Sequence, residues 1–141
     1  MKTHLLRLIC GALVLLLFYT AAAKLLDLER FERELGNQVL PSWSLPVLLW
    51  LIPAAELAVV VLILTRRFRL AGLFGAAALM AVFTGYMGLV LLNVFDRVPC
   101  SCGGVLKSMD FEVHFVFNLF FLLLSIAGTW LQRSTAPASA V

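Results

Sequence analysis

The chain has 141 residues, of which 62% are hydrophobic and 13% charged, with 11 Lys or Arg, 8 Asp or Glu and a formal net charge of +3. A mean hydropathy of +1.01 excludes an ordinary soluble domain and predicts an integral membrane protein. The positive charge does not indicate a nucleic-acid partner, because the cations follow a membrane topology instead of forming one basic patch.

Four apolar stretches are suited to cross a bilayer, since a spanning helix needs roughly 17 to 25 residues. They cover about residues 5–23, 45–65, 70–95 and 111–131. The sequence therefore predicts an all-α fold, a bundle of four transmembrane helices. The bundle forms a single membrane domain, residues 1–133, and a disordered tail follows at residues 134–141.

The charges outside the spans predict the orientation of the bundle. The N-terminal end, the second connection and the tail hold six cations and no acid: Lys2, Arg7, Arg66, Arg67, Arg69 and Arg133. The first and third connections hold five cations against seven acids. The positive-inside rule therefore places both termini in the cytoplasm. We expect a multi-pass protein of the bacterial inner membrane, in contact with the lipid bilayer, whose third connection faces the periplasm.

The first span has a second interpretation as a secretory signal. It has a basic start, an apolar core and Ala21-Ala22-Ala23 as a cleavage site. Cleavage would leave three spans and would set the cluster Arg66 to Arg69 in conflict with the new N-terminus. A retained first span is the interpretation that agrees with the charges.

The first connection predicts a short amphipathic helix over residues 24–36, with Asp27 as N-cap and Gly36 as the stop. Its apolar face consists of Leu28, Phe31 and Leu35. Such a helix lies in the membrane interface and covers the bundle. A solvated helix that only joins two spans is the alternative.

Glu56 is the only acid within a predicted span. A carboxylate near the bilayer centre costs at least about 2.5 to 3.5 kcal/mol, so we expect it to be protonated or paired inside the bundle. Pro53, three residues earlier, frees the carbonyl of Leu49 and bends the helix. Together they indicate an internal polar pocket, and a neutral Glu56 hydrogen-bonded between helices is the alternative.

Small residues recur every four positions in the third span, at Ala77, Ala81 and Gly85. Such a stripe predicts close approach of a neighbouring helix. Met80 and Met87 also lie in this span, and core packing explains them better than metal ligation.

The last span carries a polar stripe on one helix face: His114, Asn118, Ser125 and Thr129. Because polar side chains avoid lipid, this face must point inward. We expect the internal polar pocket to include Lys24, Glu56, Tyr86 and Asn118.

The third connection contains Pro99-Cys100-Ser101-Cys102-Gly103-Gly104. A disulfide between thiols one residue apart is strained, and it stabilises weakly because the loop is short. Strained, exposed disulfides are typically those that exchange. Cys100, Cys102 and His114 are therefore candidate catalytic residues, with His114 as base and Arg97 and Lys107 adding positive potential.

Three functional interpretations follow from this loop. The first is a thiol–disulfide oxidoreductase, with Glu56 and the Asn118 face forming a polar route or a cavity that contacts a quinone as possible cofactor. The second is a Zn²⁺ or copper site with Cys100, Cys102 and His114 as ligands. The third is an assembly factor without catalysis, whose cysteines only shape the loop.

The chain also resembles the four-helix membrane proteins of the MauE/DoxX group over nearly its whole length. The resemblance is carried by Lys24-Leu25-Leu26-Asp27, Phe31, Pro53, Glu56, Phe83-Thr84, and by Cys100-Ser101-Cys102-Gly103-Gly104-Val105-Leu106 with His114 and Asn118. The loop is similar to the branch of the group that carries Cys-Ser-Cys-Gly-Gly. The resemblance implies a DoxX-like bundle that supports extracytoplasmic disulfide formation or redox maturation. The implied partner is a thioredoxin-like or disulfide-bearing extracytoplasmic protein.

Overall fold

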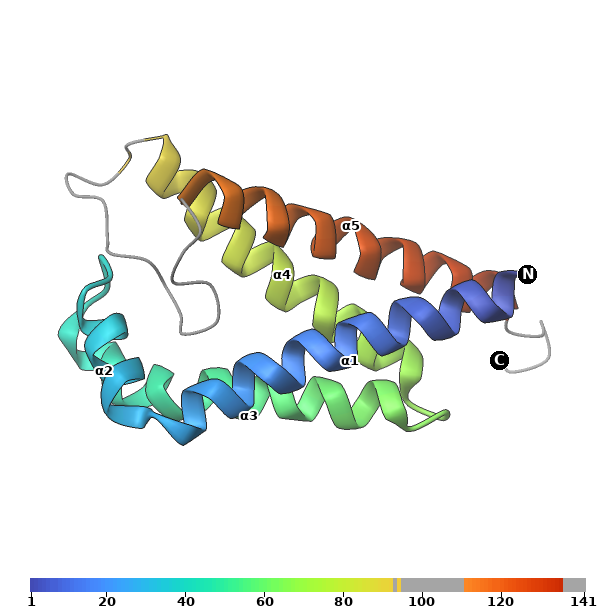
Figure 1. Ribbon diagram of the computed structural model, residues 1–141, viewed down its shortest axis with the longest axis horizontal. Coiled ribbons are helices and arrows are strands. Elements are labelled where there is room, and N and C mark those ends of the chain that lie inside the picture. The colour runs from blue at the N-terminus through green and yellow to red at the C-terminus, as the bar shows by residue number, and fades with distance from the viewer. Residues whose placement is uncertain (93, 95–110, 136–141) are drawn as a thin grey trace.

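The protein is all-helical in the part of the chain that the computed structural model describes, residues 1–92, 94 and 111–135 (Figure 1). The elements are α1 (Lys2–Leu26), α2 (Leu28–Gly36), the 3-10 turn η1 (Ser42–Ser44), α3 (Leu45–Leu64), α4 (Arg69–Leu91) and α5 (Phe111–Thr135). No strand occurs among these residues. The predicted all-α fold, with a short helix between the first two spans, is confirmed.

Four of the helices are long and apolar enough to cross a membrane: Lys2–Leu26, Ser42–Leu64, Arg69–Leu91 and Glu112–Thr135. The third ends four residues before the predicted end at residue 95. Its last turn is closed by two backbone hydrogen bonds, from Leu92 N–H to the Gly88 carbonyl and from Val94 N–H to the Leu89 carbonyl. The last span continues to Thr135, past the predicted end at residue 131.

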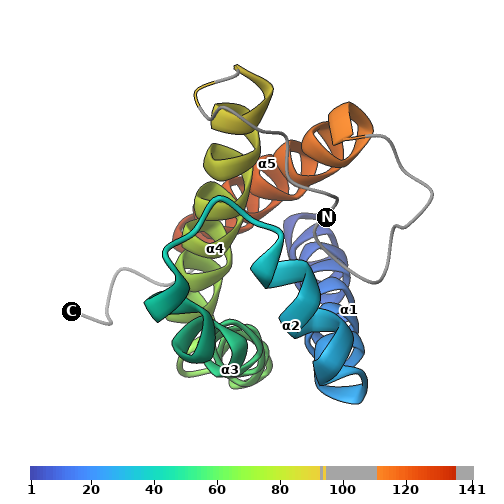
Figure 2. The ribbon, with the colours of Figure 1, turned by 90° about the vertical axis from the view of Figure 1, so that its left-hand side faces the viewer.

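The bundle is closed at one end and open at the other. α1 and α5 lie together at the end that carries the N-terminus, and they diverge toward the end that carries α2 (Figure 1). The view onto that open end shows α2 in front of the bundle (Figure 2).

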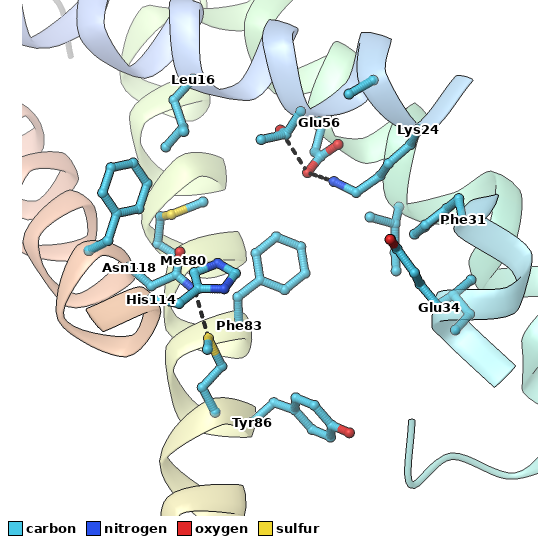
Figure 3. A pocket seen from close by; sticks show the side chains of 16 residues that line it. Leu16, Lys24, Phe31, Glu34, Glu56, Met80, Phe83, Tyr86, His114 and Asn118 are labelled. Carbon is cyan, nitrogen blue, oxygen red and sulfur yellow. Dashed lines mark hydrogen bonds and ion pairs between the residues drawn. The ribbon is translucent and has the colours of Figure 1, made fainter. Parts of the chain in front are cut away.

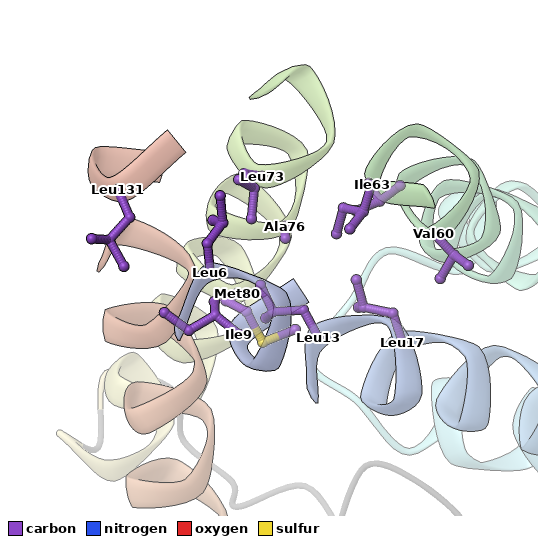
Figure 4. Close-up of a cluster of buried hydrophobic side chains, with 11 residues drawn as sticks. Leu6, Ile9, Leu13, Leu17, Val60, Ile63, Leu73, Ala76, Met80 and Leu131 are labelled. Carbon is purple, nitrogen blue, oxygen red and sulfur yellow. The ribbon is translucent and has the colours of Figure 1, made fainter. Parts of the chain in front are cut away.

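The closed end is filled by a cluster of buried apolar side chains from four helices (Figure 4). Its members are Leu6, Ile9, Leu13, Leu17, Val59, Val60, Ile63, Leu73, Ala76, Met80 and Leu131. Large apolar side chains on the outer surface, such as Leu8, Leu15 and Val116, are exposed. Such a surface is suited to lipid. Packing, and not exclusion of water, must then hold the helices together.

Glycines make the closest helix contacts. A Cβ on Gly72 would lie 2.6 Å from the Ile63 backbone nitrogen, and one on Gly128 would lie 2.9 Å from Ile9 Cγ2. The predicted stripe is wrong, because Ala81 and Gly85 are exposed and no atom lies within 4 Å of a Cβ on Gly85. The contact face starts at Gly72 and continues through Ala76, one residue out of step with the prediction. A shift of one residue along an α-helix turns the contact face by about 100° around the helix axis.

The predicted surface helix forms, but it begins at Leu28 and not at residue 24, because α1 continues to Leu26. The Asp27 carboxylate accepts a hydrogen bond from Arg30 N–H at 3.1 Å, which caps the helix. Phe31 and Leu35 are buried against the bundle. Arg30 and Glu34 form an ion pair at 2.9 Å on the polar side. The helix ends at Gly36, and Asn37 after it is right-handed, so no left-handed glycine cap is involved.

The glycine contacts predict opposite results for two matched substitutions. Gly72→Ala should lower the free energy of unfolding by about 1 to 3 kcal/mol, because the new methyl group overlaps backbone atoms of α3. Gly85→Ala should cause no loss, because its methyl group meets no atom. Unfolding in detergent micelles with increasing SDS measures both. Equal stability of the two variants would contradict the helix contact.

Candidate functional site

A cavity of about 160 Å³ lies at the open end of the bundle, and all five α-helices line it. Its lining residues are Leu16, Thr20, Ala23, Lys24, Phe31, Glu34, Leu35, Ile52, Glu56, Met80, Phe83, Tyr86, Met87, His114, Phe117 and Asn118. Most of these side chains are apolar, and a few polar groups interrupt them (Figure 3). This composition is typical of small-molecule sites.

An ion pair forms one wall of the cavity (Figure 3). Lys24 Nζ lies 2.7 Å from Glu56 Oε1, and the Thr20 hydroxyl donates to the same oxygen at 3.2 Å. Glu56 is only 1% exposed, and its Oε2 has no hydrogen-bond partner among the described residues. Lys24 also lies over the Phe31 ring, 5.8 Å from its centroid. The structure thus gives the carboxylate of the second span a charged partner.

Local sequence places these groups together. Thr20 and Lys24 are one helical turn apart near the end of α1, so they share a face. Glu56 lies in the middle of α3, one turn after the buried Pro53. A proline has no N–H, so the helix loses one backbone hydrogen bond at this level. The pair therefore joins the end of α1 to the middle of α3.

The opposite wall is formed by α4 and α5 (Figure 3). The Asn118 amide donates to Met87 Sδ at 3.1 Å, and both residues are buried. His114 lies one turn earlier on α5 and is half-buried. A thioether sulfur is a weak acceptor, so the Asn118 amide is readily available to a better one.

The predicted polar stripe of α5 does point inward. Ser125 is fully buried and donates to the Leu122 carbonyl, and Thr129 donates to the Ser125 carbonyl. These two hydroxyls are thus satisfied within their own helix. Of the stripe, only His114 and Asn118 line the cavity.

Tyr86 connects the cavity wall to the segment between α2 and η1. Its hydroxyl donates to Gln38 Oε1 at 2.8 Å and accepts from Val39 N–H at 3.3 Å. Gln38 is buried and also donates to the Glu34 carbonyl at the end of α2. The tyrosine therefore holds this segment and α2 against α4.

The cavity brings together Lys24, Glu56, Tyr86 and Asn118, the residues predicted for an internal polar pocket, and it adds His114. Thr20 and Gln38 were not predicted. The four-residue spacing of Thr20 from Lys24 places both on one face of the helix, and this could have predicted that Thr20 faces the pocket. Nothing in the sequence marks Gln38. Cys100, Cys102, Arg97 and Lys107, and the tail after Thr135, lie outside the described residues.

No group of three His, Cys, Asp or Glu side chains suited to a metal ion occurs within the described ranges. The predicted Zn²⁺ or copper ligands include Cys100 and Cys102, which are not among those ranges. Met80 belongs to the apolar cluster of the closed end, as expected for core packing. Cys10 is half-buried in α1 and packs against the same cluster.

Comparison with known proteins gives one family. The family model described as methylamine utilisation protein MauE matches residues 2–131. Neither a curated protein nor a solved structure matches the chain.

The ion pair predicts non-additive effects of substitution. Lys24→Met and Glu56→Met should each lower the free energy of unfolding by about 3 kcal/mol, because each leaves one group of a buried pair alone. The double variant Lys24→Met/Glu56→Met should lose less than the sum, since it buries no unpaired charge. Thermal unfolding in detergent measures all three. Strict additivity would show that the two groups do not interact.

Proposed function

The chain belongs to the family of the methylamine utilisation protein MauE, and from this premise we propose that it is a thiol–disulfide redox protein of the membrane. It supports extracytoplasmic disulfide formation or the maturation of partner proteins. The family membership and the four apolar helices make it a multi-pass membrane protein. The redox role comes from the chemistry of its cysteine motif.

The observation that carries the proposal is the sequence Cys100-Ser101-Cys102-Gly103-Gly104 in the connection between α4 and α5. The thiolate of one cysteine attacks a disulfide of the partner and forms a mixed disulfide, releasing one partner thiolate. The second cysteine then attacks the mixed disulfide, which yields the Cys100–Cys102 disulfide and the reduced partner. The reverse sequence oxidises a partner dithiol. Gly103 and Gly104 have no side chain that would hinder attack on either sulfur.

His114 supports this chemistry as the proton acceptor. It is the fourth residue of α5, the helix that follows the cysteine connection. An imidazole near a thiol accepts its proton and favours the thiolate, which is the reactive form. The half-buried ring also lines the cavity that contains the ion pair. His114 is therefore near the thiol motif in sequence and shares a cavity with Lys24 and Glu56.

The charge distribution supports an outward-facing cysteine connection. With both termini in the cytoplasm, Cys100 and Cys102 face the periplasm of a bacterial inner membrane. Thiols are oxidised there and kept reduced in the cytosol. The partner is then a thioredoxin-like or disulfide-bearing extracytoplasmic protein.

Trapping a mixed disulfide tests the proposal. In cells that express Cys100→Ser or Cys102→Ser, one variant should accumulate a covalent adduct with an extracytoplasmic protein, because the cysteine that resolves the adduct is missing. Non-reducing gel electrophoresis detects the adduct, which should disappear on reduction. Cys10→Ser is the matched control, since it removes a thiol that packs against the apolar cluster of the closed end and should trap nothing.

Three results would contradict thiol exchange. The absence of an adduct in both variants is the first. Full activity of the Cys100→Ser/Cys102→Ser protein would indicate an assembly factor without catalysis. A stoichiometric metal ion that is lost in Cys100→Ser would indicate the metal site instead.

A further inference from the structure

The cavity has the dimensions of a single ring. Its volume of about 160 Å³ is close to that of an engineered apolar cavity of about 150 Å³ that binds benzene. In a lipid environment, helices associate mainly through van der Waals contacts, and an empty cavity forfeits those contacts. A space of this size beside a buried ion pair is therefore better explained by a ligand than by imperfect packing.

Polar groups of the cavity lie on two opposite walls, and Glu34 of α2, which is paired with Arg30, also lines it. Lys24 is a cationic donor on one wall, and the Asn118 amide and His114 lie on the other (Figure 3). Leu16 of α1, Phe83 of α4 and Phe117 of α5 supply flat or branched apolar surface to the walls. This arrangement suits a ring that has a hydrogen-bond acceptor at each end.

The outer surfaces of α1 and α5, two of the helices that line the cavity, are suited to lipid. Side chains of both α1 and α5 line the cavity, and the Lys24 side chain is 17% exposed. Exposed side chains of α1 and α5 near this level are largely apolar, among them Tyr19, Val113 and Val116. A ligand that enters between these helices must dissolve in hydrocarbon.

Other ligand classes fit less well. A small organic cation would be repelled by the Lys24 ammonium, which already donates a hydrogen bond to Glu56 Oε1. A free anion would be repelled by the Glu56 carboxylate and would not partition into lipid. A neutral ring with two acceptor oxygens meets neither difficulty.

We propose that this cavity binds the head group of a lipid-soluble quinone, and, resting on the proposed function, that the quinone accepts the electrons of the loop thiols. Oxidation of Cys100 and Cys102 to a disulfide releases two electrons and two protons. One quinone takes up both electrons and both protons and becomes a quinol. Lys24 and the Asn118 amide donate to the two quinone oxygens, and Glu56 accepts a hydrogen bond from the quinol.

Binding of decylubiquinone, a short-tailed quinone, tests the site. It is titrated into the protein in nanodiscs, and quenching of tryptophan fluorescence reports saturable binding. Lys24→Met and Asn118→Leu should each weaken binding at least about tenfold, because each removes a donor from a different wall. Lys2→Met is the matched control, since it removes an exposed lysine at the other end of α1, and it should bind as the wild type does. Asn118→Leu removes only the weak hydrogen bond to Met87 Sδ, so we expect little loss of stability. Weaker quinone binding by this variant would then not result from unfolding.

The same titration distinguishes this site from the thiol function. Cys100→Ser/Cys102→Ser should bind decylubiquinone normally, because the proposed hydrogen-bond donors to the quinone are Lys24 and Asn118. Equal binding by all variants, or displacement of decylubiquinone by an equal concentration of 1-undecanol, would overturn the quinone site even if a mixed disulfide is trapped. Normal binding without reduction of the quinone by the dithiol form would overturn the electron transfer and leave the binding site standing.

Discussion

The ion pair between Lys24 and Glu56 is the constraint on which the arrangement of the open end depends. A carboxylate in a membrane-spanning helix is costly unless a partner neutralises it. Glu56 lies in the middle of α3, so its partner must come from a neighbouring helix, and the end of α1 supplies it. Because α2 begins two residues after α1 ends, the pair also fixes where α2 can lie, and Phe31 of α2 packs against Lys24.

The closed end of the bundle is tightly packed, whereas the open end contains the cavity. At the closed end, interlocking apolar side chains and the close contacts at Gly72 and Gly128 provide the packing that holds helices together in lipid. At the open end, α1 and α5 separate and polar groups face a cavity. The stability of one end allows the other to keep space for a ligand, as is common where function needs imperfect packing.

His114 gives the proposed chemistry a physical connection between its two parts. It follows the cysteine motif closely in sequence, and its ring lines the cavity whose far wall is the ion pair. Tyr86, which also lines the cavity, hydrogen-bonds to the segment after α2 and so holds that segment against α4. Thiol exchange at the membrane surface and a redox ligand within the bundle are thus proposals that share a residue, although different experiments decide them.

Hydropathy alone determined the four spans, and the residues at Asp27 and along α2 determined the surface helix, because both depend on local sequence. Polar residues such as Asn118 and Ser125 also revealed which face of α5 points inward, since only polar groups distinguish protein from lipid. Apolar and small residues carry no such signal, and the contact face of α4 was therefore predicted one residue out of register. Only the tertiary structure decided that Lys24 is the partner of Glu56 and that Gln38 meets Tyr86, because these contacts join residues 32 and 48 positions apart.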